Sequence, residues 1–308
     1  DLARATSGAA ATLLGKIYLR NHDYANAKTY IDMVLNSGQY ELESDFKYVW
    51  SENNKYGKEM IFALLHETGN NAAEIACHFG PSDHPEVPGR WQYYGVSLPF
   101  WRSYDKEDPR REFFYYDYTG DAKRDDQSDY GFHYMVPEEG VTVVPNDTTK
   151  YMQNVATMKY TYDMISDAYY DGRTICIFRL SDVILCKAEI ENNLNGPAAA
   201  LPYLNQIRAR AGAPEYGKHN RFPAPSTKEA MKDAILKERC YELVFEFQRR
   251  ADLIRFGKYE EVVNAHLKKL GIAQPTNVTS SLRYFPYPLN DAQLNPNLAA
   301  ENPSRLPK

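Results

Sequence analysis

The sequence predicts a mostly α-helical protein in which two helical hairpins are separated by a long, loop-rich insertion. Three observations lead to this prediction. Residues 3–36 and 180–211 each show the apolar periodicity of two packed helices. Between them, residues 40–178 contain turn residues, aromatic residues and short apolar runs in place of long helical periodicity. Residues 274–308 are rich in Pro and Asn, which favours an irregular C-terminal segment.

Both hairpins have the residue spacing of tetratricopeptide repeats. Gly15 and Ala27 are 12 residues apart, at positions where two helices cross closely and only small side chains fit. Ala188 and Ala200 repeat the same 12-residue interval in the second hairpin. Asp23 follows the predicted turn of the first hairpin and is expected to be the N-cap of its second helix. The hairpins therefore predict tetratricopeptide-like helical repeats.

Two further helices are expected after the second hairpin. Ser226-x-x-Glu229 is a capping box that opens a helix from 227 to about 247, and another helix runs from about 258 to 270. We therefore interpret the chain as one domain, 1–308, with these parts: a helix pair at 1–39, the insertion at 40–178, helices at 179–272 and an irregular segment at 273–308.

Length and composition limit the possible functions. A chain of 308 residues can bury a full core. The net charge of −5 gives no basic surface for nucleic acid. The 25 tyrosines exceed what a core needs, because a buried Tyr must also satisfy its hydroxyl group. No apolar run approaches the roughly 20 residues of a membrane helix. The chain starts without Met, and we expect it to be part of a longer protein.

Residues 238–258 combine glutamates and arginines at helical spacing. Glu238, Glu242 and Glu246 recur every four residues, which places three carboxylates on one helix face. Such rows are more often ion-pair lattices than catalytic carboxylate pairs, and neighbouring arginines lower a carboxyl pKa. We therefore expect a structural lattice in which the glutamates pair with arginines of the same stretch, namely Arg239, Arg249, Arg250 and Arg255.

Three motifs in order along the chain, the runs 179–189, 238–258 and 283–298, resemble those of the SusD/RagB family, the surface nutrient-capture lipoproteins of Bacteroidetes-type bacteria. The run 179–189 is similar to the family's Arg-Leu-Ala-Asp-Val-x-Leu-x-x-Ala-Glu helix, with Ser181 and Cys186 substituted. The stretch 238–258 resembles the family's helix signature. The run 283–298 is similar to its closing motif, with Asn290 or Asp291 near the usual Glu.

The resemblance implies a non-catalytic, lipid-anchored protein exposed on the cell outer membrane. Such a protein captures an oligosaccharide or polysaccharide and delivers it to a SusC-like TonB-dependent transporter. The helices would pack against the transporter, and the inserted loops would hold the ligand. Family members are longer, so the lipid anchor and the first repeats would lie outside this chain. No cofactor is implied. Some relatives capture peptides, and a RagB-like peptide-binding function remains the alternative.

The segment 88–95 contains the best candidate ligand contacts. Three aromatic residues alternate there with amide or small residues between two glycines, in a predicted loop. The flat C–H face of a sugar ring packs on aromatic planes, while amide and Arg groups bond its hydroxyls. Packing of the loop on the scaffold is the alternative role. Together with two upstream positions, the candidate ligand-binding residues are Asn71, His78, Arg90, Trp91, Gln92, Tyr93 and Tyr94.

Other site classes fit the sequence less well. A glycoside hydrolase needs two carboxylates about 5 to 10 Å apart, one with a raised pKa, whereas the glutamate row here is flanked by arginines. An intracellular tetratricopeptide adaptor needs a continuous groove, which two separated hairpins do not provide. Cys77, His78 and His84 lack the spacing of a metal site, and residues 121–129 lack the pattern of a calcium loop. We therefore expect neither an enzyme nor a metal centre.

Overall fold

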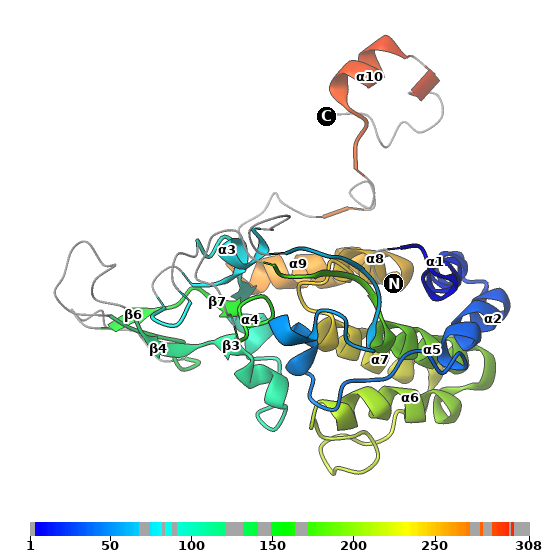
Figure 1. Ribbon diagram of the computed structural model, residues 1–308, viewed down its shortest axis with the longest axis horizontal. Coiled ribbons are helices and arrows are strands. Elements are labelled where there is room, and N and C mark those ends of the chain that lie inside the picture. The colour runs from blue at the N-terminus through cyan, green and yellow to red at the C-terminus, as the bar shows by residue number, and fades with distance from the viewer. Residues whose placement is uncertain are drawn as a thin grey trace. The chain divides into compact units, whose positions relative to one another are not determined.

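The computed structural model describes most of the 308-residue chain. The described residues are 4–67, 74–81, 84–87, 91–120, 132–140, 149–163, 172–271, 278–279, 285–295 and 297–298. They fall into two compact units, an N-terminal unit (Asp1–Glu246) and a C-terminal unit (Phe247–Lys308). Figure 1 shows that helices dominate the N-terminal unit.

Two helical hairpins and a fifth helix form the scaffold of the N-terminal unit. The first hairpin packs on the second through α2 and α5, and α7 packs on both helices of the second hairpin (Figure 1). The predicted hairpins are therefore confirmed. Their bounds are α1 (Ser7–Arg20), α2 (Tyr24–Leu35), α5 (Leu180–Asn195) and α6 (Pro197–Arg210), followed by α7 (Lys228–Glu242).

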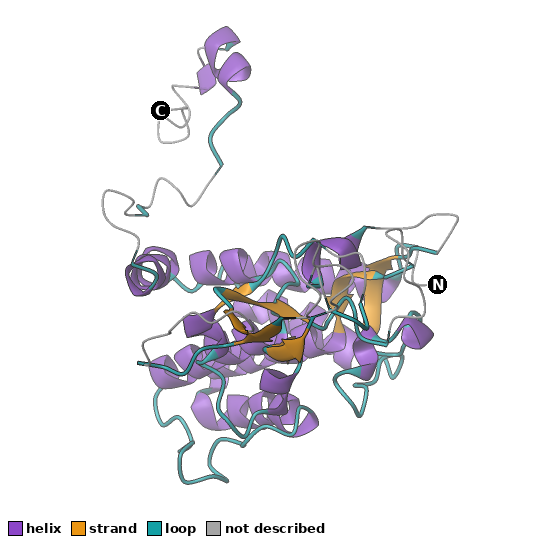
Figure 2. Ribbon diagram, turned by 90° about the vertical axis from the view of Figure 1, so that its left-hand side faces the viewer, coloured by secondary structure: helices purple, strands orange, loops and turns teal. Residues whose placement is uncertain are grey.

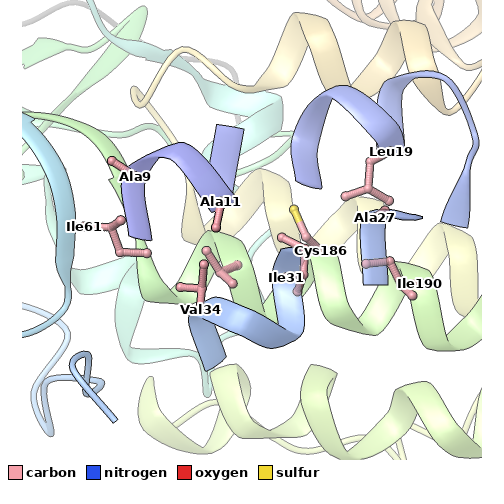
Figure 3. Packing of buried hydrophobic residues seen from close by; sticks show 10 residues of the cluster. Ala9, Ala11, Leu19, Ala27, Ile31, Val34, Ile61, Cys186 and Ile190 are labelled. Carbon is pink, nitrogen blue, oxygen red and sulfur yellow. The ribbon is translucent and has the colours of Figure 1, made fainter. Parts of the chain in front are cut away.

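Small side chains allow the helices to approach closely, as the spacing predicts. A Cβ atom on Gly15 would lie 2.8 Å from Cδ1 of Ile31 on α2. Ala27, Ala188 and Ala200 are all fully buried. Figure 3 shows the apolar cluster that α1, α2 and α5 enclose, with Ile31 in its interior. Asp23 caps α2 by accepting a hydrogen bond from the backbone N–H of Asn26 at 3.1 Å.

Helix α7 differs from its predicted bounds at both ends. Its N-cap is Thr227, whose hydroxyl accepts from the Ala230 N–H, so the predicted cap at Ser226 is wrong by one residue. The helix ends at Glu242, because the Glu242 carbonyl accepts hydrogen bonds from Lys159 Nζ at 2.8 Å and Arg179 Nη2 at 2.9 Å. A longer helix would use that carbonyl for its own backbone.

The insertion folds into small sheets and short helices (Figure 2). Strands β1 (Met60–Leu64) and β8 (Ile175–Arg179) pair antiparallel. A second sheet has the order β2-β7-β3, and a third has the order β4-β5-β6 with β5 and β6 parallel. Their bounds are β2 (Val96–Ser97), β7 (Asn154–Thr157), β3 (Phe114–Tyr115), β4 (Asp117–Thr119), β5 (His133–Met135) and β6 (Thr149–Tyr151).

Short helices complete the insertion. Trp101 of α4 and Tyr104 are buried, and Phe100 packs against the same cluster, which confirms the core role that their spacing predicts. The helix itself covers only four residues, so Tyr104 lies in the turn after it. The bounds are η1 (Tyr48–Trp50), η2 (Glu52–Asn54), α3 (Ile75–Phe79), α4 (Leu98–Trp101) and η3 (Pro109–Glu112).

The C-terminal unit contains α8 (Arg249–Arg255), α9 (Tyr259–Lys269) and α10 (Leu289–Leu294). Helix α9 confirms the predicted helix at 258–270. The Pro and Asn content of residues 273–308 predicts an irregular segment, but this segment contains the short helix α10. The side-chain amide of Asn264 donates a hydrogen bond to the carbonyl of Val278 and accepts one from the N–H of Val278. Among all described helices, none is long and apolar enough to cross a membrane.

Candidate functional site: an exposed aromatic platform

The candidate loop is fixed to helix α3 through backbone hydrogen bonds. The N–H of Trp91 donates to the Cys77 carbonyl at 2.7 Å, and the N–H of Tyr94 donates to the His78 carbonyl at 3.0 Å. The carbonyls in the last turn of a helix lack partners within the helix. Because α3 has only five residues, the loop backbone supplies partners for two of its carbonyls.

Gln92 and Gly95 fix the other side of the loop to strand β7. Gln92 adopts a left-handed backbone conformation with φ 49°, and its Nε2 donates to Oδ1 of Asn154 at 3.1 Å. A Cβ atom on Gly95 would lie 2.7 Å from the same Oδ1 and 3.1 Å from the Val155 carbonyl oxygen. Glycine is therefore required at position 95 for the loop to approach β7.

The rings of His78, Trp91, Tyr93 and Tyr94 form what we call the aromatic platform. The His78 ring centroid lies 5.2 Å from Trp91, 5.4 Å from Tyr93 and 6.1 Å from Tyr94. The Trp91 and Tyr93 rings lie 5.4 Å apart. The exposed fractions of Trp91, Tyr93 and Tyr94 are 38%, 66% and 55%. Three large rings that pack around His78 and still face solvent are typical of a surface that binds a flat ligand.

The structure brings five of the seven predicted ligand-binding residues together. These are the four platform residues and Gln92, whose side-chain amide is engaged by Asn154. Asn71 and Arg90 lie outside the residues that the structure describes. The role of all seven in binding remains a prediction.

Sequence reasoning did not single out two residues that support the platform. Phe79 is 4% exposed, and its ring lies 5.3 Å from that of Tyr94. Asn154 holds Gln92 from 62 positions along the chain. The apolar neighbour of His78 offered a local signal for Phe79, but no local pattern links Asn154 to the loop.

A second group of rings lies near the β4-β5-β6 sheet. Tyr118 of β4 stacks on Tyr134 of β5 with ring centroids 5.1 Å apart and planes 13° apart. His84 is 9% exposed, and its ring lies 4.7 Å from Tyr115 and 4.8 Å from Tyr118. His84 is thus mostly enclosed by this second group.

The predicted glutamate row forms a buried ion-pair network, but with different arginines. Glu242 pairs with Arg179 at 2.7 Å, with Arg110 at 3.1 Å and with Arg210. Arg179 also binds Glu246 at 2.6 Å. The network's other members are Glu59, Asp108, Lys159, Arg208 and Glu238.

The arginines that bind the glutamates therefore come from distant segments, since the fold brings side chains of β8, η3 and α6 to Glu242 of α7. Two of the predicted pairing arginines have carboxylate partners outside the row. Arg239 pairs with Asp182 at 2.7 Å, and Arg255 pairs with Asp252 at 3.0 Å. The glutamates form a structural ion-pair lattice, as predicted, but the predicted arginine partners of Glu242 are wrong.

The network is unsuited to acid–base chemistry. Burial alone would raise the pKa of Glu242, but the guanidinium groups of Arg210, Arg179 and Arg110 outweigh it and hold that pKa well below its usual range. A general acid of a glycosidase needs a raised carboxyl pKa. Across the described part of the chain, no three His, Cys, Asp or Glu side chains are grouped for metal binding.

Comparisons with known proteins give the family and the fold. The sequence model of the SusD family matches residues 58–304. SusD-like protein P25 of Formosa agariphila is 26% identical over 319 residues, which cover 96% of this chain and 58% of that protein. Starch-binding protein SusD of Bacteroides thetaiotaomicron is 28% identical over 137 residues, or 44% of this chain and 22% of that protein. The chain thus spans little more than half of the length of its first curated relative.

Solved structures share the same architecture. Surface glycan-binding protein A from Bacteroides thetaiotaomicron, in complex with laminarihexaose, has a TM-score of 0.70 and 22% identity, with 96% of this chain and 63% of that chain covered. A laminarin binding SusD-like protein has a TM-score of 0.65 and 22% identity, with 94% and 61% covered. The mostly α, tetratricopeptide-like fold is confirmed. Since the family match covers most of its residues, the chain belongs to the SusD family.

Proposed function

We propose that this protein is a non-catalytic surface protein that captures an oligosaccharide or polysaccharide on its aromatic platform. One observation carries the proposal: three exposed rings are held around His78 by a loop whose backbone is fixed on two sides. Membership in the SusD family supports it, because solved proteins of the same fold include glycan-binding ones.

The platform has the chemistry that sugar recognition needs. Indole and phenol rings offer flat apolar faces to the C–H groups of a pyranose, while the phenol hydroxyls of Tyr93 and Tyr94 can bond its hydroxyls. Fixing the loop before binding reduces the conformational entropy that the ligand must offset. A few stacking contacts give modest affinity, so the captured glycan would also be released readily.

The proposed destination of the glycan is a SusC-like TonB-dependent transporter in the outer membrane. The protein would be held at the cell surface by an N-terminal lipid anchor. The helical hairpins would provide the surface that meets the transporter. Surface proteolysis of the full-length protein would test its exposure on the cell, and co-purification with the transporter would test the contact between the two proteins. Absence of both proteins from the membrane fraction would contradict this proposal.

The platform itself is tested by native affinity electrophoresis against a panel of neutral and charged polysaccharides. We expect retardation on one glycan, with roughly tenfold weaker binding for Trp91→Ala and for Tyr93→Ala, because truncated aromatic anchors commonly cost more than 1 kcal/mol. Tyr56→Ala is the matched control, since Tyr56 and Tyr93 are both 66% exposed and Tyr56 lies outside the platform. Equal losses for Tyr56→Ala and Tyr93→Ala would contradict the proposed site. Retardation on no glycan would favour peptide cargo.

A further inference from the structure

A cavity of about 310 Å³ lies in the N-terminal unit, away from the aromatic platform. Its walls come from the turn after α4, the end of α6, the loop around Phe222 and the last turns of α7. In Figure 1, α6 lies at the lower edge of this unit and α3 at its upper edge. Two other cavities among the described residues hold only about 10 and 20 Å³. A volume of 310 Å³ is within the range of small-molecule sites.

The cavity has an excess of positive charge. Two of its cationic side chains already have carboxylate partners: Arg221 pairs with Asp105 at 2.8 Å and with Glu107 at 2.6 Å, and Arg208 pairs with Glu238 at 2.7 Å. The other carboxylate of the lining, Asp108, pairs with Arg110 at 2.8 Å. Each acidic group at the cavity therefore has an arginine partner, and Arg221 is shared by two carboxylates.

Two lysines of the lining remain without such a partner. Lys106 and Lys237 make no salt bridge with any residue that the structure describes, and both are exposed. The Lys237 ammonium lies 5.6 Å from the ring centroid of Tyr241, which also lines the cavity. The lining holds four cationic side chains and two carboxylates, so its net charge of +2 attracts an anion.

Arg208 adds a buried donor. Its side chain is 3% exposed, with Nε donating to the Pro214 carbonyl at 2.6 Å and Nη1 donating to Glu238 at 2.7 Å. Its Nη2 has no hydrogen-bond acceptor among the described residues. A buried guanidinium that lines a cavity and retains an unused N–H group is a ready partner for a carboxylate or sulfate oxygen.

Aromatic side chains supply an apolar wall. The ring of Phe222 lies 4.8 Å from the Arg208 guanidinium and is half-buried. Tyr241 is 5% exposed, and its hydroxyl is already used in a hydrogen bond to the Ser103 carbonyl. The cavity thus places cationic donors beside the half-buried ring of Phe222, which suits an anion that also has an apolar part.

We propose that this cavity binds an anionic monosaccharide unit such as a uronate. Its carboxylate would interact with Lys106, Lys237 and Nη2 of Arg208, and its ring would pack on Phe222. The choice of a sugar as the anion rests on the proposed capture function, but none of the lining residues belongs to the aromatic platform, so the two sites can be tested separately. It adds a second site that selects for negative charge.

The test is isothermal titration of the chain with D-glucuronate and with D-glucose at low ionic strength. We expect glucuronate to bind and glucose to bind at least tenfold more weakly. The double variant Lys106→Gln/Lys237→Gln should weaken glucuronate binding about tenfold or more. Both lysines are exposed, so the variant keeps its fold, which circular dichroism would verify.

Two variants serve as controls. Lys58→Gln removes an exposed lysine elsewhere, and Tyr93→Ala alters the aromatic platform; neither should change glucuronate binding. Equal binding of glucose and glucuronate would overturn the proposed charge selection. Unchanged glucuronate binding in the double lysine variant, or its loss in Tyr93→Ala, would overturn the proposed location.

Discussion

At the scale of single residues, Glu242 is the centre of the buried network. Its carboxylate binds three guanidinium groups, and its carbonyl accepts hydrogen bonds from Lys159 and Arg179. Removing one charge of a buried ion pair leaves its partners uncompensated in a region of low dielectric constant. The side chain of Glu242 therefore determines whether several cations can stay buried.

We expect Glu242→Gln to lower the free energy of unfolding by about 3–5 kcal/mol, the usual cost of breaking a buried pair from one side. Urea denaturation followed by tryptophan fluorescence measures the change. Lys58→Gln is the control, because the Lys58–Glu41 pair is 74% and 70% exposed and such pairs contribute less than about 1 kcal/mol. Similar losses for both variants would contradict a stabilising role of the network.

Sequence spacing identifies which carboxylates share a helix face, but not which cations they meet. Arg179 and Arg210 are 63 and 32 positions from Glu242 along the chain. Spacing alone points to the arginines within the stretch 238–258 as partners of the glutamates. The actual partners, Arg179 and Arg210, can be found only from how β8 and α6 are placed against α7. The same limit explains why Asn154, which holds Gln92, was not predicted.

At the scale of elements, the hairpins were predictable because their signals are local. Apolar periodicity, the Asp23 cap and paired small residues all lie within about 30 residues of one another in each hairpin. The small sheets of the insertion were not predicted as such, since strands of two to five residues pair across long separations. The early end of α7 has the same kind of cause, because a distant lysine and arginine bind its last carbonyl.

The crossing of α1 and α2 can be tested directly. Gly15→Leu should destabilise the N-terminal unit by about 1–3 kcal/mol, since even a Cβ atom at this position would lie 2.8 Å from Ile31, which is fully buried. Ala10→Leu on the exposed face of the same helix should change stability by less than about 0.5 kcal/mol. Thermal unfolding monitored by circular dichroism compares the two. A Gly15→Leu protein as stable as Ala10→Leu would contradict close packing at the crossing.

At the scale of the N-terminal unit, the buried ion pairs make stability depend on pH. Burial raises the pKa of Asp182, but Lys16 and Arg239 outweigh it and bring the pKa far below its ordinary 3.8. The pKa of Glu242 is likewise depressed below 4.5 by its arginines. A depressed folded-state pKa gives stability that is complete above the unfolded-state pKa and is lost as the pH falls toward the folded-state value.

We therefore expect the free energy of unfolding to be level near pH 6–7 and to fall steadily below about pH 4.5. Urea titrations at successive pH values measure this dependence. Glu242→Gln removes one of the two carboxylates, so its curve should be less steep in acid than that of the original protein. Parallel curves would show that Glu242 does not contribute to the acid sensitivity.

The way in which the platform loop is anchored bears on how its ligand preference could be altered. Its path is set by main-chain hydrogen bonds to α3, the Gln92 amide and the absence of a side chain at Gly95. The backbone N–H groups of Trp91 and Tyr94 make the anchoring hydrogen bonds, while the rings of Trp91, Tyr93 and Tyr94 stay at least 38% exposed. We therefore expect other side chains at these three positions to leave the main-chain hydrogen bonds of the loop in place. The scaffold is suited to producing a library of binders with altered sugar preference from one unchanged backbone.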